Sequence, residues 1–192
     1  KTPGGTVLLY GGLKGNSASE EGWTYDYFGG DNQNISNLNV PRGNFGATID
    51  GLDRAYAIGG LDDSNHVLAS VERYDRAADQ WDDVAPLPAP RQNAATVIDD
   101  AGHIYVFGGQ TGTGTTGIVT TSYRYDVASD TWDAVAPLPF GTIDSAAVFA
   151  PDGDIYVLGG RTAAGAVASV HGKEGRLRHL RAHGVGVVGG DT

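Results

Sequence analysis

Short apolar runs that each end in a pair of glycines recur along the chain. They are TVLLYGG at residues 6–12, RAYAIGG at 54–60, HIYVFGG at 103–109 and DIYVLGG at 154–160. Apolar and aromatic runs of this length, bounded by glycine and aspartate, are typical of buried β-strands and too short for most helices. The pattern predicts an all-β protein, and the glycine pairs mark a repeat with steps of 48, 49 and 51 residues.

Further residues keep the same register. Tyr-Asp pairs stand at 25–26, 74–75 and 125–126, and the segments WDDVAPLP and WDAVAPLP begin at Trp81 and Trp132. Each repeat can be divided into four strands, which in the third repeat are residues 94–98, 104–109, 120–126 and 131–138. The joint pattern of Gly-Gly, Tyr-Asp, Trp and Pro-Leu-Pro is far more specific than a glycine pair alone.

This pattern, with a period near 50 residues, resembles the kelch repeat, in which each repeat forms one four-stranded antiparallel blade of a β-propeller. The resemblance covers about residues 5–170. It implies an incomplete ring of about three to four blades, with units at about 1–44, 45–93 and 94–144 and a partial unit at 145–170. Residues 171–192 depart from the repeat, with four Lys/Arg and two Asp/Glu, and read as a divergent basic tail or a disrupted repeat.

Structural roles account for most of the repeated residues. We expect three aromatic residues to fill the space between blades and to bond polar partners: Tyr105, Tyr125 and Trp132. The glycine pairs are expected where strands crowd and a Cβ would obstruct the backbone. Turns are predicted at the Asp-Gly pairs 50–51 and 152–153 and at Asp79 and Asp130.

Composition excludes several kinds of chemistry. The net charge of -10 argues against binding nucleic acid or an anionic membrane. With no cysteine there is neither a disulfide nor the cysteine-tyrosine centre of the copper oxidases related to galactose oxidase. The histidines at 66, 103, 171, 179 and 183 form no metal-binding motif. We therefore expect no metal, no cofactor and a soluble protein, whose compartment stays open and could be extracellular or the cell surface.

A ligand site is expected on loops at one end of the blades. The kelch resemblance implies that the loop after each glycine pair and the loop before each first strand share the channel mouth. Arginines follow proline there in two repeats, and two guanidiniums would suit a carboxylate ligand; an equally good interpretation is that each arginine pairs with an aspartate of the next blade. The candidate ligand-binding residues are Arg42, Asn44, Asp62, Asn65, Arg91, Asn93, Gln110, Asp144 and Arg161. The third repeat has Thr142 in place of the arginine.

Three functions are compatible with this sequence. The first is a non-enzymatic binding module that holds a peptide or glycan at the channel mouth. The second is a sugar-modifying enzyme similar to the sialic-acid mutarotase branch of kelch proteins, with catalytic residues unassigned. The third is a structural surface scaffold. Fold alone does not separate them.

Unclosed blades predict self-association. A propeller normally closes with 4 to 8 blades, and three to four blades would leave apolar sheet faces uncovered at both ends. We expect Val7, Leu9, Val148 and Val157 to line these faces and the chain to associate through them.

Trp23 lies outside the register of Trp81 and Trp132, so we predict that it is the most exposed of the three tryptophans. Iodide quenching of variants that each retain a single tryptophan measures this directly. The alignment of the repeats is wrong if Trp23 is the least accessible.

Overall fold

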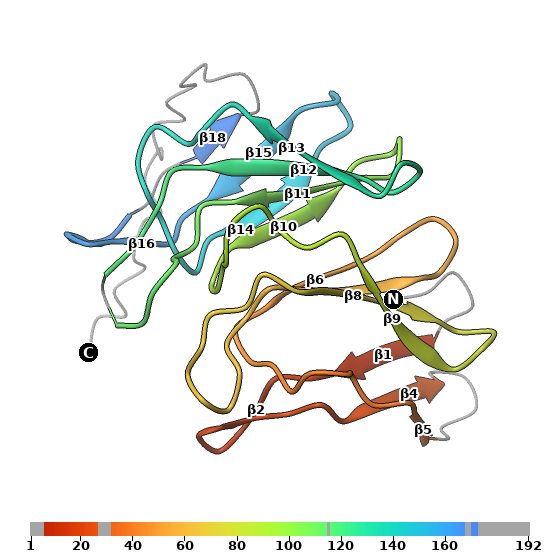
Figure 1. Cartoon of the computed structure of the whole chain (residues 1–192). Coiled ribbons are helices and arrows are strands. Elements are labelled where there is room, and N and C mark those ends of the chain that lie inside the picture. The colour runs from red at the N-terminus through yellow and green to blue at the C-terminus, as the bar shows by residue number, and fades with distance from the viewer. Residues whose placement is uncertain (1–5, 27–31, 115, 168–169, 173–192) are drawn as a thin grey trace, which may run out of the picture.

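The computed structural model describes residues 6–26, 32–114, 116–167 and 170–172, and every regular element in these ranges is a β-strand (Figure 1). The prediction of an all-β fold is therefore confirmed. No helix in the described part of the chain has the length and hydrophobicity needed to cross a membrane. The expected basic tail begins at residue 171, and residues 173–192 lie outside the described residues.

Four antiparallel sheets follow one another along the chain, and we call them blades A to D. Blade A consists of β1 (Thr6–Tyr10), β4 (Gly22–Asp26) and β5 (Asn32–Ile35). Blade B consists of β6 (Gly46–Ile49), β7 (Ala55–Ile58), β8 (Val71–Asp75) and β9 (Gln80–Val84). Blade C consists of β10 (Ala95–Ile98), β11 (His103–Phe107), β12 (Ser122–Asp126) and β13 (Thr131–Val135). Blade D consists of β14 (Ala146–Phe149), β15 (Ile155–Leu158) and β18 (Val170–Gly172). Two small hairpins stand outside the blades, β2 (Leu13–Lys14) with β3 (Ser17–Ala18) and β16 (Arg161–Thr162) with β17 (Gly165–Ala166).

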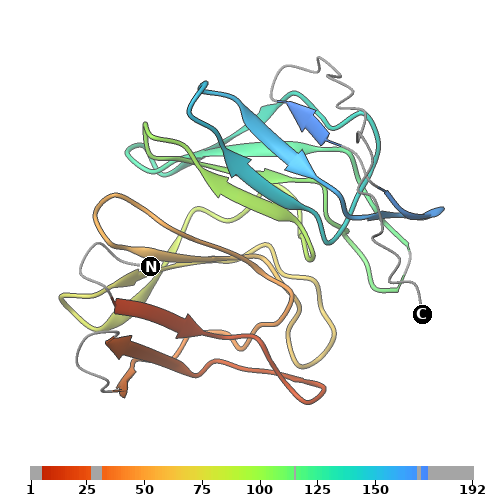
Figure 2. The same cartoon turned by 180° about the vertical axis from the view of Figure 1, so that it is seen from behind.

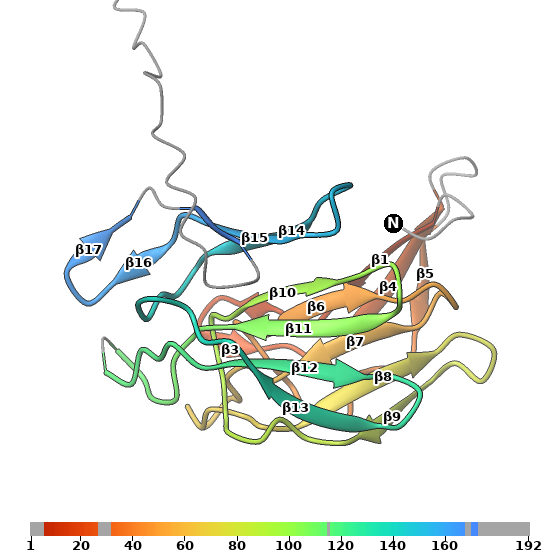
Figure 3. The ribbon, with the colours of Figure 1, turned by 90° about the horizontal axis from the view of Figure 1, so that it is seen from above.

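The blades lie next to one another in chain order. Blade A, in red, and blade D, in blue, are at the two ends, with blades B and C between them (Figures 1 and 2). Figure 3 shows blade C stacked on blade B strand for strand, so that β10 lies beside β6 and β11 beside β7. Each inner blade therefore has a neighbour on both faces.

Successive residues of the second strand in each blade point alternately toward the next blade and the preceding blade, and they form the contacts between blades. In β7, Tyr56 and Ile58 face blade C and pack in one cluster with Ile104 and Val106. The intervening Ala55 and Ala57 face blade A, where they join a second cluster. The third cluster, between blades C and D, contains Tyr105, Phe107, Ile155 and Val157. We call the face turned toward the next blade the forward face and the other the backward face.

The glycine pairs connect each blade to the linker that leads into the next blade. The amide of Gly60 donates to the carbonyl of Arg91, 2.7 Å away, and Gly109 donates to Thr142 O at 2.8 Å. A Cβ on Gly109 would lie 2.7 Å from Gln92 O, and its φ of 81° falls in the left-handed region. Glycine is needed here for both reasons. The interpretation of the glycine pairs from sequence is thus confirmed.

A second recurring contact joins the outer strands. The indole NH of Trp132 donates to Ala85 O at 2.8 Å, while the Ala85 amide donates to Asp130 Oδ1, which also accepts from the Tyr125 hydroxyl at 2.6 Å. The same atoms of Trp81, Ser36, Asp79 and Tyr74 repeat it between blades A and B. Hydrogen bonds, first from Tyr125 and then from the Ala85 amide, lower the pKa of Asp130. This contribution to stability is therefore present at neutral pH and is lost as the pH falls through the carboxyl pKa.

The structure agrees with the predicted turns and with most of the predicted burial of aromatic side chains. Asp79 and Asp130 are turn residues with φ of 49° and 55°, as predicted. Tyr105 and Tyr125 are buried between blades, whereas Trp132, on an outer strand, is only half-buried. Trp23 is 37% exposed and Trp81 is 5% exposed.

One residue was assigned to the wrong face. Val157 was expected on an uncovered face, but it is 2% exposed. It packs with Tyr105 and Phe107 because it lies on the backward face of blade D. Leu9 and Val148, in contrast, are 54% and 44% exposed, as expected, and Val7 is half-buried.

Two glycines separate the steric role of the glycine pair from its backbone role. Gly108→Ala must place a Cβ 2.6 Å from Thr142 O in the next linker, whereas Gly102, also in the left-handed region with a φ of 86°, has open space around it. A left-handed φ costs a non-glycine residue about 1–2 kcal/mol, and overpacking costs about 1–3 kcal/mol more. Urea unfolding should therefore show a clearly larger loss of unfolding free energy for Gly108→Ala than for Gly102→Ala. Equal losses would mean that the close approach of the blades contributes nothing.

Candidate functional site

Two kinds of loop meet at one end of blades B, C and D: the linker that leads into the blade and the loop that follows its glycine pair. In blade B the linker residue Gly43 pairs with Leu61, which follows the glycine pair, through two backbone hydrogen bonds of 2.9 and 2.8 Å. Gln92 pairs with Gln110 in blade C in the same way, and Ile143 pairs with Arg161 in blade D. The loops at this end, which we call the rim, are therefore held on a repeated backbone frame.

Three of the predicted site residues form a row across the rim. Asn44, Asn93 and Asp144 each precede the first strand of a blade and have φ between 53° and 56°. The amide of Asn93 donates to Asn44 O at 2.9 Å, and the amide of Asp144 donates to Asn93 O at 3.1 Å. Asparagine and aspartate tolerate this left-handed backbone better than most residues. Consecutive blades are thus joined at the start of their inner strands.

Arg42 lies inside the protein rather than at a channel mouth. Its guanidinium has no exposed surface and forms an ion pair with Glu72, also buried, on β8. It also donates to Gly59 O at 2.9 Å and to Ser70 O at 3.0 Å. Burial lowers the pKa of Arg42, and Glu72 acts in the opposite direction. The arginine therefore pairs with a carboxylate of the following blade, as in the alternative interpretation, but this carboxylate belongs to a glutamate and not to an aspartate.

Arg91 occupies the same position in blade C but has a different environment. It is 2% exposed, and it donates to the hydroxyl of Thr121. The guanidinium carbon lies 5.3 Å from the ring centre of Tyr123, which replaces Glu72 in this blade. Among the described residues no carboxylate pairs with Arg91, and its Nε atom is buried without a hydrogen-bond partner. Arg91 is therefore a buried cation without a counterion in the described structure.

The other predicted residues lie in the loops after the glycine pairs. Asp62 accepts hydrogen bonds from the amides of Ser64 and His66, both at 2.8 Å, and the His66 amide is the main cause of its lowered pKa. Asn65, in the same loop, is exposed with a φ of 62°. The side chain of Gln110 is buried, and its Oε1 has no partner among the described residues.

Arg161 and Asp144 form an exposed ion pair on the rim of blade D. The two hydrogen bonds to Asp144 Oδ2 come from Nε at 2.9 Å and Nη2 at 2.6 Å. Pairs with this degree of exposure contribute little to stability, so both side chains are available at small cost. The rim thus brings the predicted residues to one end but removes Arg42 and Arg91 from its surface.

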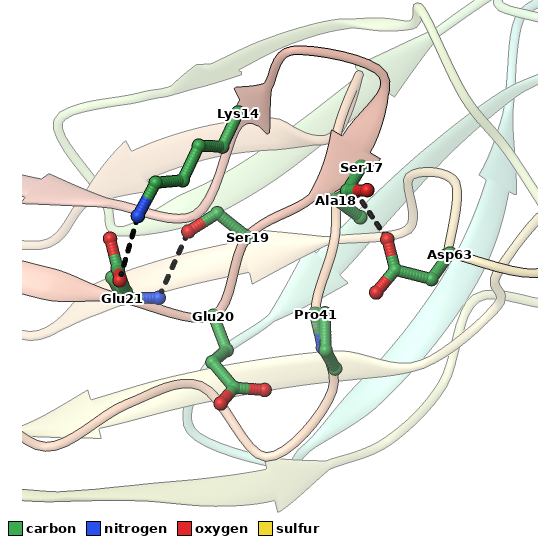
Figure 4. Close-up of a pocket in the computed structure, with 8 residues that line it drawn as sticks. All are labelled: Lys14, Ser17, Ala18, Ser19, Glu20, Glu21, Pro41 and Asp63. Carbon is green, nitrogen blue, oxygen red and sulfur yellow. Dashed lines mark hydrogen bonds and ion pairs between the residues drawn. The ribbon is translucent and has the colours of Figure 1, made fainter.

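An open pocket of about 370 Å³ lies on the rim between the hairpin of blade A and the loop of blade B (Figure 4). Its lining comprises Lys14, Ser17, Ala18, Ser19, Glu20, Glu21, Pro41 and Asp63. Asp63 crosses the boundary between the blades, because its Oδ1 accepts from the amide of Ala18 at 2.5 Å. Lys14 reaches Glu21 at 3.4 Å. Three carboxylates against one ammonium make this pocket acidic.

Sequence reasoning missed this pocket. Of its lining residues only Pro41 belongs to a repeated position, and the segment SASEEG at 17–22 has no similar sequence in the other units. The only available signal was the pair Glu20-Glu21 following a turn, which by itself is typical of any solvated surface. The pocket depends on Asp63, which is 45 residues distant from its hydrogen-bond partner.

Comparison with known proteins yields one family and several relatives. The family model described as N-acetylneuraminate epimerase matches residues 39–165. Beta-scruin of Limulus polyphemus is 36% identical over 112 residues, covering 56% of this chain and 12% of that protein. Kelch-like protein 35 of Mus musculus is 40% identical over 106 residues, covering 55% and 17%. Kelch-like protein terF of Aspergillus terreus is 31% identical over 136 residues, covering 67% and 29%. The matches thus span between 12 and 29% of these three relatives.

Replacing each arginine separately tests the difference between the two buried sites. Arg42→Met leaves the buried charge of Glu72 unpaired, which typically costs about 3–5 kcal/mol. Arg91→Met leaves no carboxylate unpaired and should lower the free energy of unfolding by about 1–3 kcal/mol through lost hydrogen bonds. Adding Glu72→Gln to Arg42→Met should recover part of the loss, because the unpaired charge is removed. Urea unfolding of the four proteins decides it; no recovery would contradict the ion pair.

Proposed function

Because this chain belongs to the kelch-repeat family, we propose that it is a binding module that holds a peptide or glycan ligand on the rim. The observation that carries the proposal is that the same backbone pairs hold the rim loops in successive blades, whereas the sequences of the loop tips differ. The backbone pairs that hold the loops recur in blades B, C and D. The tips read LKGNSA at 13–18, LDDSNHV at 61–67, QTGTGTTGI at 110–118 and RTAAGA at 161–166. A rigid scaffold with chemically different loops is the usual form of a recognition surface.

The acidic pocket is the central subsite of this proposal. Its carboxylates and serine hydroxyls accept and donate hydrogen bonds, so they suit sugar hydroxyl groups or the basic side chains of a peptide. Asn44, Asp62 and Asn65 on the neighbouring part of the rim add further polar contacts. The original expectation of a carboxylate ligand rested on Arg42 and Arg91 at the surface, and both are buried. We therefore propose that this acidic subsite prefers a basic or an uncharged polar ligand to a carboxylate.

Peptide and glycan arrays, read at low and high salt, test the proposal. We expect at least one ligand whose affinity falls about 10- to 100-fold in Glu20→Gln/Glu21→Gln, since hydrogen bonds to charged groups contribute roughly 1.5–3 kcal/mol. The matched control is Asp82→Asn/Asp133→Asn, which removes the same charge from the outer strands of blades B and C. Binding of basic peptides should also weaken with salt. No ligand on either array, or equal losses in both variants, would contradict the proposal and favour a structural scaffold.

A sugar-modifying enzyme is the second candidate, favoured by the match to the N-acetylneuraminate epimerase model. In this alternative a carboxylated sugar binds on the rim of blades C and D. Arg91 has no carboxylate partner among the described residues, and Arg161 is exposed beside Asp144. Asn93 and Gln110 lie on the same part of the frame. Entry of the carboxylate to Arg91 would require the linker to open.

Titration with N-acetylneuraminate, followed by NMR, tests this second candidate. Binding should fall about tenfold or more in Arg91→Met and should be unchanged in Arg124→Met, which removes an arginine from the outer part of blade C. N-acetylglucosamine serves as the uncharged sugar. An enzyme must in addition accelerate the interconversion of the bound sugar. Equal affinity in both variants would remove Arg91 from the site.

A further inference from the structure

Exposed apolar side chains gather on two faces of the described structure. Of its seven large exposed hydrophobic residues, five lie on the outer faces of the terminal blades: Leu9, Trp23, Tyr25, Val148 and Leu158. Strand pairing puts Leu9 beside Trp23 and Val7 beside Tyr25, so these four side chains share the backward face of blade A. Ala146 pairs with Leu158, and Val148 pairs with Tyr156, on the forward face of blade D. Patches of this kind on a folded protein mark sites of association.

The same positions are buried wherever two blades meet. Leu9 is 54% exposed, but its counterparts Ala57, Val106 and Val157 are 0%, 1% and 2% exposed. Tyr25 is 37% exposed, while its counterparts Tyr74 and Tyr125 are 2% and 1% exposed. Leu158 is 38% exposed, against 2% for Ile58 and 5% for Phe107. Each outer face therefore has the composition of one half of a contact between blades.

The outer faces of blades A and D correspond to opposite sides of a contact between blades. In all three contacts, forward residues of one second strand pack on backward residues of the next: β1 on β7, β7 on β11 and β11 on β15. No described strand covers the forward face of blade D or the backward face of blade A. We propose that a second copy of this chain docks head to tail, with the forward face of blade D against the backward face of blade A of the other copy. This contact continues the series of three by repeat geometry.

Sequence differences make this contact weaker than those inside the chain. Blade A has Asn32 where blades B and C have Trp81 and Trp132, so the indole hydrogen bond to the preceding blade is missing. The contact is mainly apolar, with Val148 and Leu158 facing Val7 and Leu9. Both copies carry a net charge of -10. Association should therefore be reversible and should strengthen with salt, because salt screens the repulsion between like charges. Binding of basic peptides on the rim responds to salt in the opposite direction.

Complementation of two single-face variants tests the proposal. Leu9→Lys places a charge on the face of blade A, and Val148→Lys places one on the face of blade D; both side chains are already exposed, so the fold should tolerate the lysine. Leu52→Lys, in a turn at 73% exposure, is the matched control. Analytical ultracentrifugation over a range of concentrations gives the oligomeric state of each variant and of the mixture. Unfolding curves confirm that each variant is folded.

Head-to-tail docking has a distinctive result. The wild type and Leu52→Lys should associate with rising concentration, and each single-face variant alone should be a monomer. An equimolar mixture of Leu9→Lys and Val148→Lys should form a 1:1 dimer, since one intact face of each kind remains, and growth should stop there. A wild type that stays monomeric at all concentrations overturns the proposal. So does a Val148→Lys variant that still dimerises alone, because that result means like faces pair.

Discussion

The fold depends on how closely one blade can approach the next. The amide of the second glycine in a pair donates to a carbonyl of the following linker, at 2.7 Å for Gly60 and 2.8 Å for Gly109. A Cβ on Gly59 or on Gly108, the first glycine of these two pairs, would lie 2.3 Å from Arg91 O or 2.6 Å from Thr142 O in the same linkers. A sheet of three or four strands cannot bury both of its faces alone, so this approach decides whether the apolar strands are covered at all.

The same contact also positions the rim. Each linker that accepts from a glycine pair then bonds the loop that follows the next pair, so packing between blades and loop placement share one frame. The buried pair of Arg42 and Glu72 belongs to this frame, because it fastens the linker to β8. Arg91 holds the equivalent linker through Thr121 and the ring of Tyr123. Loop tips attached to such a frame can differ in charge and length without loss of the fold, which is why the rim is the proposed binding surface.

The same alternation of forward and backward residues occurs in inner and terminal blades, but the burial of these residues differs. Where a neighbour is present, forward residues such as Tyr56 and Ile58 are at most 2% exposed. In the described part of the chain, Leu9 and Val148 on the outer faces of the terminal blades are 54% and 44% exposed. The acidic charge of the chain works against their association, whereas apolar contact favours it. The two proposed activities therefore use separate surfaces, the rim for a ligand and the blade faces for a second copy.

The sequence alone predicted the features that depend only on the residues of single strands and turns. The repeat of glycine pairs, Tyr-Asp pairs and tryptophans was sufficient for the blades, for burial of Tyr105 and Tyr125, and for the turns at Asp79 and Asp130, since each depends on local periodicity and backbone preference. It also indicated which loops share the rim. It could not identify the partner of Arg42, because Glu72 is 30 residues away and its counterpart in blade C is a tyrosine.

Tertiary structure decided the rest. The acidic pocket exists because Asp63 accepts a hydrogen bond from the hairpin of the preceding blade. The outer contacts exist because Ser36 and Ala85 donate to the aspartate and accept from the tryptophan of the following blade. In these bonds Ser36 and Ala85 use their backbone amide and carbonyl groups, which nearly every residue type carries and no sequence pattern marks. Strand periodicity therefore determined which residues could be buried, and the distance between adjacent blades determined which of them were.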